Sequence, residues 1–141
     1  MTRFAGGPAD SPGFLLWHAT LRWQRAITAA LAPLDLTHVQ FVLLACVHWL
    51  IERGETPNQL AVAAQAGTDI KMTSQVLRRL EQRGLVERHT DDRDTRAKIV
   101  CITQRGRSLA VDAIERVETA DAEFFSEYPT SLVDALKRGG R

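Results

Sequence analysis

The sequence contains few cysteines and no long hydrophobic run. Its 141 residues include only Cys46 and Cys101, which are too few for a disulfide framework and too far apart for a CxxC metal knuckle. The longest strongly apolar run, residues 41–47, is far shorter than the roughly 20 residues that cross a bilayer. Residues 1–11 contain glycine, proline and aspartate in place of the apolar segment of a signal peptide. We therefore expect a soluble cytoplasmic protein.

Motifs of the common enzyme classes are also missing. The chain has no nucleophile elbow, no glycine-rich phosphate loop and no metal-binding cluster such as HExxH. Four acidic residues form an acidic face on one predicted helix, where a solvated surface is a simpler interpretation than a catalytic pair: Glu115, Glu118, Asp121 and Glu123. We expect no enzymatic activity, no cofactor and no metal ion.

The net charge of +1 conceals an uneven distribution of charge along the chain. Residues 71–107 contain ten basic and five acidic residues, whereas the rest of the chain contains eight basic and twelve acidic residues. Such polarity steers a polyanion such as nucleic acid toward one face of a protein. A solvated helix followed by a charged loop would give the same pattern, so charge alone leaves both interpretations open.

Hydrophobic periodicity and capping residues predict a mainly α fold with a small β-hairpin. Helices are expected over residues 12–33, 38–52, 57–66 and 70–83, followed by strands over 85–89 and 97–102. Two more helices are expected, from Thr103 as cap to about residue 128, and over 131–138. The other predicted caps are Thr37, Thr56 and Asp69, with Pro57 at the first helical position. Residues 56–102 would then form a helix-turn-helix followed by a two-stranded wing.

The helix predicted over residues 70–83 has two chemically distinct faces. One face, suited to burial by its spacing of three and four residues, consists of Thr73, Val76, Leu77 and Leu80. Another face has only polar side chains: Lys71, Ser74, Gln75, Arg78 and Gln82. These groups can bond phosphate oxygens and base edges in a major groove, and we also count Thr73 among the candidate contacts. An ordinary surface helix has a polar outer face too, so that alternative stays open.

The turn expected over residues 90–96 is too polar for a hairpin inside the core. Its three aspartates can hold Arg93 and Arg96 in fixed orientations, and an arginine at the tip can enter a minor groove, where negative potential is concentrated. The alternative is a solvated hairpin whose surface ion pairs contribute little to stability. Because the turn follows the polar helix face, we favour the nucleic-acid interpretation.

Several segments together resemble the multiple antibiotic resistance regulator (MarR) family. Residues 36–44 are similar to the start of that family's second helix. Residues 60–67 and 76–88 (VLRRLEQRGLVER) resemble its recognition helix region and first wing strand. The D-x-R motif of Asp94 and Arg96, followed by ITQRG at residues 102–106, resembles its wing and the start of its long fifth helix. In order and spacing the resemblance extends over residues 14–128.

The resemblance implies a homodimeric transcriptional repressor that binds double-stranded DNA at a near-palindromic operator. After a flexible tail over residues 1–11, residues 12–35 would be a dimerisation helix and 36–102 the winged helix-turn-helix. Residues 103–141 would supply a long helix and a C-terminal helix for dimerisation. Arg96 would be the minor-groove arginine with Asp94 as its orienting partner, and Ser74, Gln75 and Arg78 would face the major groove. Residues 70–72 (IKM) differ from the small polar residues usual there, so no base preference is transferred.

The resemblance also implies a ligand. Many relatives release DNA when a small aromatic molecule binds between the dimerisation and DNA-binding parts. Here the corresponding helices carry Trp17, His18, Trp23, His38, His48 and Trp49. The tryptophans can equally be core or interface residues, and the histidines could form a metal or pH site, although no ligand spacing supports one. Cys46 lies among apolar residues and is expected to be buried and unreactive, which argues against a thiol switch.

Two functions fit these features. One is a homodimeric repressor that binds DNA through the polar helix face and the arginine-bearing wing. The other is a winged-helix module that binds a protein partner without binding DNA. Salt-sensitive affinity for duplex DNA distinguishes the two, because neutralising phosphates releases counterions.

Overall fold

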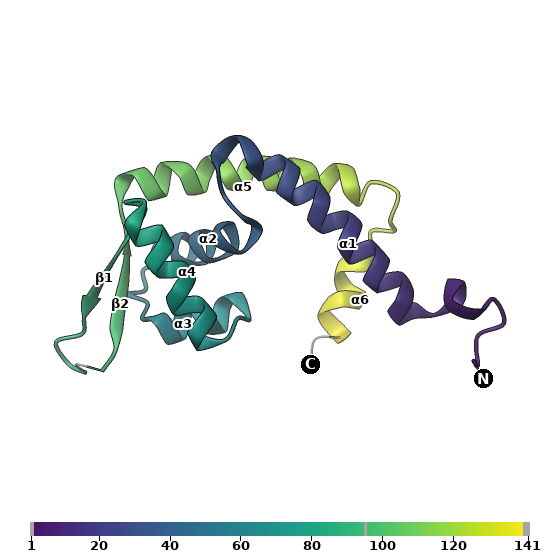
Figure 1. The fold of residues 1–141 in the computed structure, drawn as a ribbon, viewed down its shortest axis with the longest axis horizontal. Helices are drawn as coiled ribbons and strands as arrows, with labels where there is room; N and C mark the ends of the chain where they lie inside the picture. The colour runs from purple at the N-terminus through teal and green to yellow at the C-terminus, as the bar shows by residue number, and fades with distance from the viewer. Residues whose placement is uncertain (1, 95, 140–141) are drawn as a thin grey trace.

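The computed structural model describes residues 2–94 and 96–139 and has the predicted mainly α architecture with a hairpin wing (Figure 1). A 3-10 turn, η1 (Gly7–Asp10), precedes α1 (Pro12–Leu31), and η2 (Ala32–Leu34) leads to α2 (His38–Glu52). Helices α3 (Gln59–Ala66) and α4 (Ile70–Gln82) come next, followed by strands β1 (Val86–Thr90) and β2 (Lys98–Ile102). The chain continues through α5 (Gln104–Phe124) and α6 (Leu132–Gly139). Four residues lie outside the described residues: Met1 of the predicted tail, Thr95 of the predicted wing turn, and Gly140 and Arg141 of the predicted C-terminal region.

Three helices begin at the predicted side-chain caps. Thr37 forms a reciprocal capping box with Gln40, in which each side chain accepts the other residue's backbone amide at 3.2 Å. Asp69 Oδ1 accepts the Met72 amide at 2.7 Å, and Thr103 Oγ1 accepts the Gly106 amide at 3.0 Å. These bonds satisfy donors that a helix start leaves without partners, and they fix where α2, α4 and α5 begin.

The predicted start of the third helix is wrong by two residues. Helix α3 begins at Gln59 with Asn58 as its cap, whose Oδ1 accepts the Ala61 amide at 2.8 Å. Pro57 is buried instead, and its carbonyl accepts the Val100 amide at 2.9 Å. Residues 57–58 therefore lie along β2 as a short extension of the wing's sheet, which local sequence cannot indicate.

Helix α5 ends at Phe124, before the predicted end near Tyr128. The Phe125 amide still donates to the Asp121 carbonyl at 2.9 Å, but the chain then turns back. The rings of Phe124, Phe125 and Tyr128 contact one another at centroid distances between 4.9 and 6.1 Å. Tyr128 therefore packs against the end of α5 instead of extending it.

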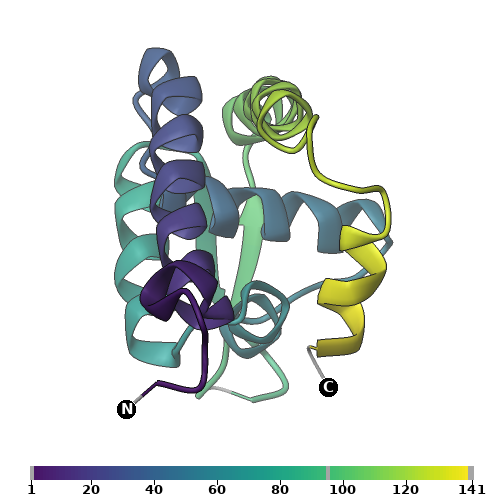
Figure 2. The same ribbon diagram turned by 90° about the vertical axis from the view of Figure 1, so that its right-hand side faces the viewer.

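A single core joins the helices to the hairpin, with α2 at its centre. Leu43, Leu44 and Val47 of α2 are fully buried. Helices α1, α3, α4 and α5 and both strands contribute buried residues to the same cluster, among them Ile27, Leu31, Val62, Leu77, Leu80, Val86, Val100, Ala110 and Ala113. The N-terminal half of α1 and helix α6 extend away from this core (Figure 1, Figure 2). The molecule therefore has a compact winged-helix lobe and an arm made of its terminal helices.

The wing is an antiparallel hairpin whose register runs from Val86 opposite Ile102 to Thr90 opposite Lys98. Its turn lies on the side of the molecule away from α5 (Figure 1, Figure 2). The N-terminal end of α4 points to that same side in both views. The fold therefore brings the two predicted DNA-binding elements to one end of the lobe.

Among the described residues, no single helix is both long and apolar enough to cross a membrane. The required length and hydropathy are reached only by Pro12–Leu34 and His38–Glu52 together, as a pair bent by 75°.

At Gly106, helix α5 passes close to the backbone of Leu85, which precedes β1. Gly106 is buried, and a Cβ atom added there would collide with the Leu85 carbonyl oxygen. We expect Gly106→Ala to lower the free energy of unfolding by about 1–3 kcal/mol, because the helix start must shift to make room. The measurement is denaturant unfolding of the wild type and the variant.

Gly13→Ala is the matched control, because Gly13 lies in α1 with open space around its Cβ position. Helix propensity predicts that this change is neutral or stabilises the fold by up to about 1 kcal/mol. Equal effects of the two substitutions would contradict the close approach.

Candidate nucleic-acid interface

Helix α4 presents a polar face to solvent, as its sequence predicts. Lys71, Gln75 and Arg78 are exposed, and Gln82 is exposed one turn further along. On the other side of the helix, the side chains of Leu77 and Leu80 are fully buried. The predicted division of this helix into a core face and a polar face is confirmed.

Thr73 lies in the core and not on the polar face. None of its surface is exposed, and its hydroxyl donates to the Asp69 carbonyl at 2.8 Å. The same hydroxyl lies 2.7 Å from that of Thr68. Because the hydroxyl is buried and bonded within the protein, the prediction that Thr73 contacts DNA is wrong. Its helical spacing with Leu77 and Leu80 is what places it in the core.

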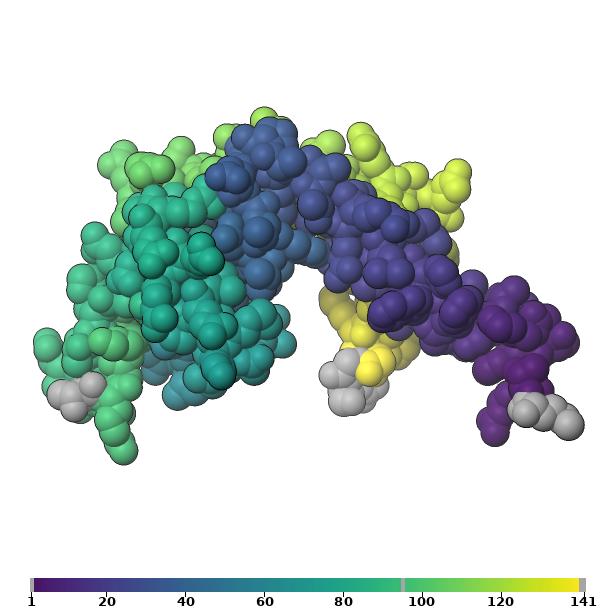
Figure 3. Space-filling model, in the orientation of Figure 1, coloured from purple at the N-terminus to yellow at the C-terminus, as the bar shows by residue number. Residues whose placement is uncertain are grey.

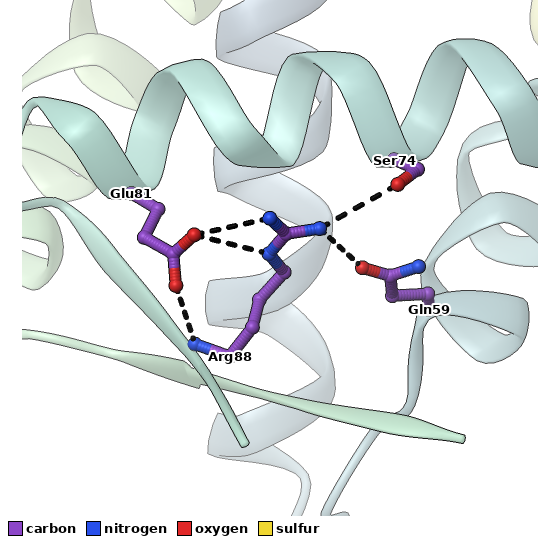
Figure 4. Close-up of polar contacts among 4 residues, drawn as sticks. All are labelled: Gln59, Ser74, Glu81 and Arg88. Carbon is purple, nitrogen blue, oxygen red and sulfur yellow. Dashed lines mark hydrogen bonds and ion pairs between the residues drawn. The ribbon is translucent and has the colours of Figure 1, made fainter. Parts of the chain in front are cut away.

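Ser74 is half-buried and belongs to a polar network centred on Arg88 of β1 (Figure 4). Arg88 Nη1 donates to Gln59 Oε1 at 2.8 Å and lies 3.5 Å from Ser74 Oγ. Its Nη2 and Nε donate to Glu81 Oε1 at 3.0 and 3.3 Å. Glu81 Oε2 also accepts the Arg88 backbone amide at 3.3 Å. One guanidinium therefore links the wing, the start of α3 and the side of α4.

Sequence reasoning misses Gln59, Glu81 and Arg88 as parts of this surface. Arg88 and Glu81 lie within a segment that resembles the MarR recognition helix and wing, but neither has a role that spacing alone could give. Their contact depends on how β1 packs beside α4, which is a tertiary feature. The only local sign of the contact is that Glu81 and Arg88 have opposite charges and lie seven residues apart.

The wing turn holds Arg96 beside Asp94. Arg96 Nε lies 3.3 Å from Asp94 Oδ1, and the Arg96 backbone amide donates to the same oxygen at 3.1 Å. The Arg96 side chain is 91% exposed, so most of the guanidinium stays open to solvent. Arg93 is also exposed, and its backbone amide donates to Asp91 Oδ1 at 2.9 Å. Both wing arginines are accessible, and the predicted pairing of Arg96 with Asp94 is present.

Two of the six predicted ligand-binding residues meet where α1, α2 and α5 converge. The Trp23 ring lies edge-on to His38 at a centroid distance of 5.0 Å, and Trp23 Nε1 donates to Asp121 Oδ1 at 2.7 Å. Burial lowers the pKa of the His38 imidazole below its ordinary value, and the nearby Asp121 carboxylate partly offsets that effect. The neutral imidazole is therefore favoured at this junction.

The other four predicted residues have different surroundings within the protomer. Trp17 is 61% exposed, and Trp49 is 54% exposed with the Arg53 guanidinium 5.9 Å from its ring centroid. His18 contacts the Phe14 ring at 4.5 Å, while the Nδ1 atom of His48 is buried without a hydrogen-bond partner. Among the six, ring contact joins only Trp23 to His38 within the described residues.

Sequence reasoning does not identify an apolar cavity of about 140 Å³ beside Trp23. The cavity lies between α1 and the chain around the end of α5, and Leu16, Phe124 and Phe125 form part of its wall. Its aromatic lining depends on the chain turning back after Phe124, which explains why helix periodicity could not reveal it.

The described residues form no metal-binding cluster, and the surroundings of Cys46 disfavour a reactive thiol at that position. Within residues 2–94 and 96–139, no three His, Cys, Asp or Glu side chains gather where they could hold a metal ion. Burial raises the pKa of the Cys46 thiol, which disfavours the nucleophilic thiolate.

Comparison with known proteins identifies relatives along most of the chain. A profile of the ArnR1-like winged-helix domain matches residues 33–120. The uncharacterized HTH-type transcriptional regulator YdcH of Bacillus subtilis (strain 168) is 45% identical over 120 residues, which covers 85% of this chain and 82% of YdcH.

Solved structures also include relatives that match most of the chain. A transcriptional regulator of the MarR family from Rhodococcus sp. RHA1 has 32% identity and a TM-score of 0.78, covering 93% of this chain and 90% of that one. CouR from Rhodococcus jostii RHA1, solved with p-coumaroyl-CoA, has 31% identity and a TM-score of 0.79, covering 94% and 91%. A transcriptional repressor, CouR, bound to a 23-mer DNA duplex has 26% identity and a TM-score of 0.83, with full coverage of both chains (100% each).

Proposed function

The chain belongs to the MarR family of winged-helix transcriptional regulators and is not an enzyme, and we propose that it is a homodimeric repressor released from its operator by a small aromatic ligand. The observation that carries the proposal is the exposed polar face of α4 beside an accessible, arginine-bearing wing. Both elements point to one end of the lobe (Figure 1). A duplex lying across that end would meet the two elements together.

Helix α4 is the element that we propose to bind in the major groove and contact the bases. In helix-turn-helix proteins the N-terminal residues of the second helix face the base edges. Here Lys71, Ser74 and Gln75 occupy those positions, and Arg78 follows one turn later on the same face. Arginine matches guanine and glutamine matches adenine in a bidentate geometry, which gives Arg78 and Gln75 the means to discriminate bases. Lys71 suits a phosphate.

The wing is the proposed minor-groove element. Asp94 fixes one edge of the Arg96 guanidinium, and the rest of the group remains open to solvent. An arginine held in this way loses less side-chain entropy when it enters a narrow minor groove, where negative potential attracts it. Arg93 lies in the same turn and suits the adjoining phosphates.

The terminal helices form the proposed dimerisation arm, over residues 12–35 and 103–141. Four consecutive residues of α1 are exposed apolar or aromatic side chains, from Phe14 at 46% to Trp17 at 61%. Helix α6 exposes Val133 and Leu136 at 58% and 59%. A hollow separates helix α6 and the N-terminal half of α1 from the winged-helix lobe (Figure 3). Large exposed apolar patches mark association surfaces, and a second copy of the chain would cover this one.

The proposed operator and ligand follow from this arrangement. A two-fold dimer presents α4 twice, so its half-sites would lie about 10 bp apart in a near-palindromic duplex. The junction of Trp23, His38 and Asp121 joins the arm to the start of α2, and the apolar cavity lies beside it. The similarity to CouR, which was solved with p-coumaroyl-CoA, supports an aromatic ligand, and we propose this junction as its site.

The DNA-contact assignment is tested by Arg96→Ala and Gln75→Ala in fluorescence polarisation with a duplex selected from random sequence by the wild type. Arg96→Ala should weaken binding about tenfold across sequences and make the log-log salt slope about one unit shallower. Gln75→Ala should instead lower discrimination at one base pair by roughly 1–3 kcal/mol. Arg78→Ala should also act mainly on sequence preference.

Arg116→Ala is the control for lost charge, because Arg116 is exposed and belongs to α5, a helix that lies on the side of the molecule away from the wing turn (Figure 1). It should bind the selected duplex like the wild type. If all three interface variants bound normally, or if Arg116→Ala were as weak as they are, the assignment would fail.

The dimer is tested by Leu16→Glu in sedimentation equilibrium. The wild type should have twice the protomer mass of 15.7 kDa, and the variant should have the protomer mass, because a buried unpaired carboxylate opposes association. Leu60→Glu on α3 is matched in exposure, 63% against 61% for Leu16, and should remain dimeric. A monomeric wild type, or an unchanged mass for Leu16→Glu, would refute the proposed arm.

The ligand class is tested by adding benzoate, 4-hydroxybenzoate and cinnamate to the preformed complex with the selected duplex. One or more should release the DNA, whereas cyclohexanecarboxylate, with the same charge but no aromatic ring, should not. His38→Gln should blunt this response while keeping the DNA affinity. Equal release by the aromatic and saturated acids would contradict an aromatic site at this junction.

A further inference from the structure

We infer that Arg88 sets the hydrogen-bond polarity of the DNA-facing surface by occupying the acceptor atoms of Gln59 and Ser74, so that both side chains offer donors to DNA. This inference rests on the proposed function and deepens it. It assigns roles to Gln59 and Arg88 beyond the α4 face and the wing turn.

The guanidinium fixes which atoms of its neighbours face it. Arginine has five N–H donors and no acceptor, so any polar atom that it touches must accept. The Gln59 amide therefore turns its oxygen toward Arg88 Nη1, at 2.8 Å, and its NH₂ group away. Ser74 Oγ lies 3.5 Å from the same Nη1 and keeps its own O–H free to donate elsewhere. Gln59 is therefore fixed as a donor on its other side, and Ser74 can donate there as well.

This polarity matches the chemistry of a DNA duplex. Phosphate oxygens only accept hydrogen bonds, and so do the N7 atoms of purines and O6 of guanine in the major groove. Gln59 is the first residue of α3, and Ser74 lies between Lys71 and Arg78 on α4. A free glutamine amide can present either its oxygen or its nitrogen, and an oxygen facing a phosphate is repelled. Arg88 removes that choice.

Glu81 makes Arg88 a positioning residue and not a phosphate contact. Its carboxylate binds Nη2 and Nε of the guanidinium and the Arg88 backbone amide (Figure 4). The Arg88 side chain is only 14% exposed. With its charge balanced and its nitrogens turned toward protein acceptors, Arg88 acts on DNA through Gln59 and Ser74.

A double-mutant cycle tests the inference with wild type, Arg88→Met, Gln59→Ala and the double variant on the selected duplex. Gln59→Ala should weaken binding roughly fivefold in the wild-type background, the loss of one hydrogen bond. In the Arg88→Met background the same substitution should change affinity less than about twofold, because the amide is no longer oriented. Equal losses from Gln59→Ala in both backgrounds would overturn the inference.

Gln59→Glu keeps the test decisive if Arg88→Met does not fold. The carboxylate still accepts from Arg88 but has no donor for DNA, so this variant should bind more weakly than Gln59→Ala. Thermal unfolding should show both Gln59 variants folded. Gln59→Glu binding as tightly as the wild type would refute the donor role.

Arg107→Met is the matched control for removing an arginine from an ion pair. Arg107 lies on α5 with its Nε 3.9 Å from Glu52 Oε1. In the Arg107→Met background, Gln59→Ala should weaken DNA binding as much as it does in the wild type. A wild type without duplex affinity would refute the proposed function, whereas a wild type that binds DNA with an additive cycle would refute only the role of Arg88.

Discussion

The burial of one side of α4 is the constraint on which the rest of the interface depends. Thr73, Leu77 and Leu80 have no exposed surface, so the rotation of the helix about its own axis is fixed. Burying a leucine side chain fully is worth roughly 1.5–3 kcal/mol, more than a typical surface hydrogen bond. The core therefore decides which side faces outward. Lys71, Gln75 and Arg78 are presented to solvent as a consequence, and none of them has to stabilise the fold.

A second constraint fixes the positions of the wing and α3 relative to α4. The backbone of residues 57–58 lies along β2, and Arg88 reaches from β1 to Gln59 and Ser74. The three elements that we propose to face DNA are thus joined by main-chain and side-chain bonds outside the apolar core. The arm of terminal helices is joined to the lobe elsewhere, through the packing of α1 and α5 on α2 and the ring contact of Trp23 with His38. In our proposal the ligand binds at this second connection and changes the distance between the two rigid winged-helix lobes of the dimer.

Local sequence predicts the parts of this structure that local chemistry determines. The Thr37, Asp69 and Thr103 caps and the two faces of α4 could be predicted because each depends on residues within one or two helical turns. The start of α3 was not predictable, because Pro57 is held by a strand more than forty residues later. The Arg88 network and the aromatic cavity were missed for the same reason. Family resemblance supplied the pairing of Arg96 with Asp94, and it could not supply base preference.

The central claim is that this surface binds duplex DNA, and the salt dependence of wild-type affinity tests it most directly. Each protomer offers four exposed cations there, Lys71, Arg78, Arg93 and Arg96. The slope of log affinity against log salt falls by about 0.9 for each phosphate that is neutralised. A dimer using at least half of its eight cations should therefore give a slope of about −3.6 or steeper. A slope near zero, or no measurable affinity at low salt, would contradict the account.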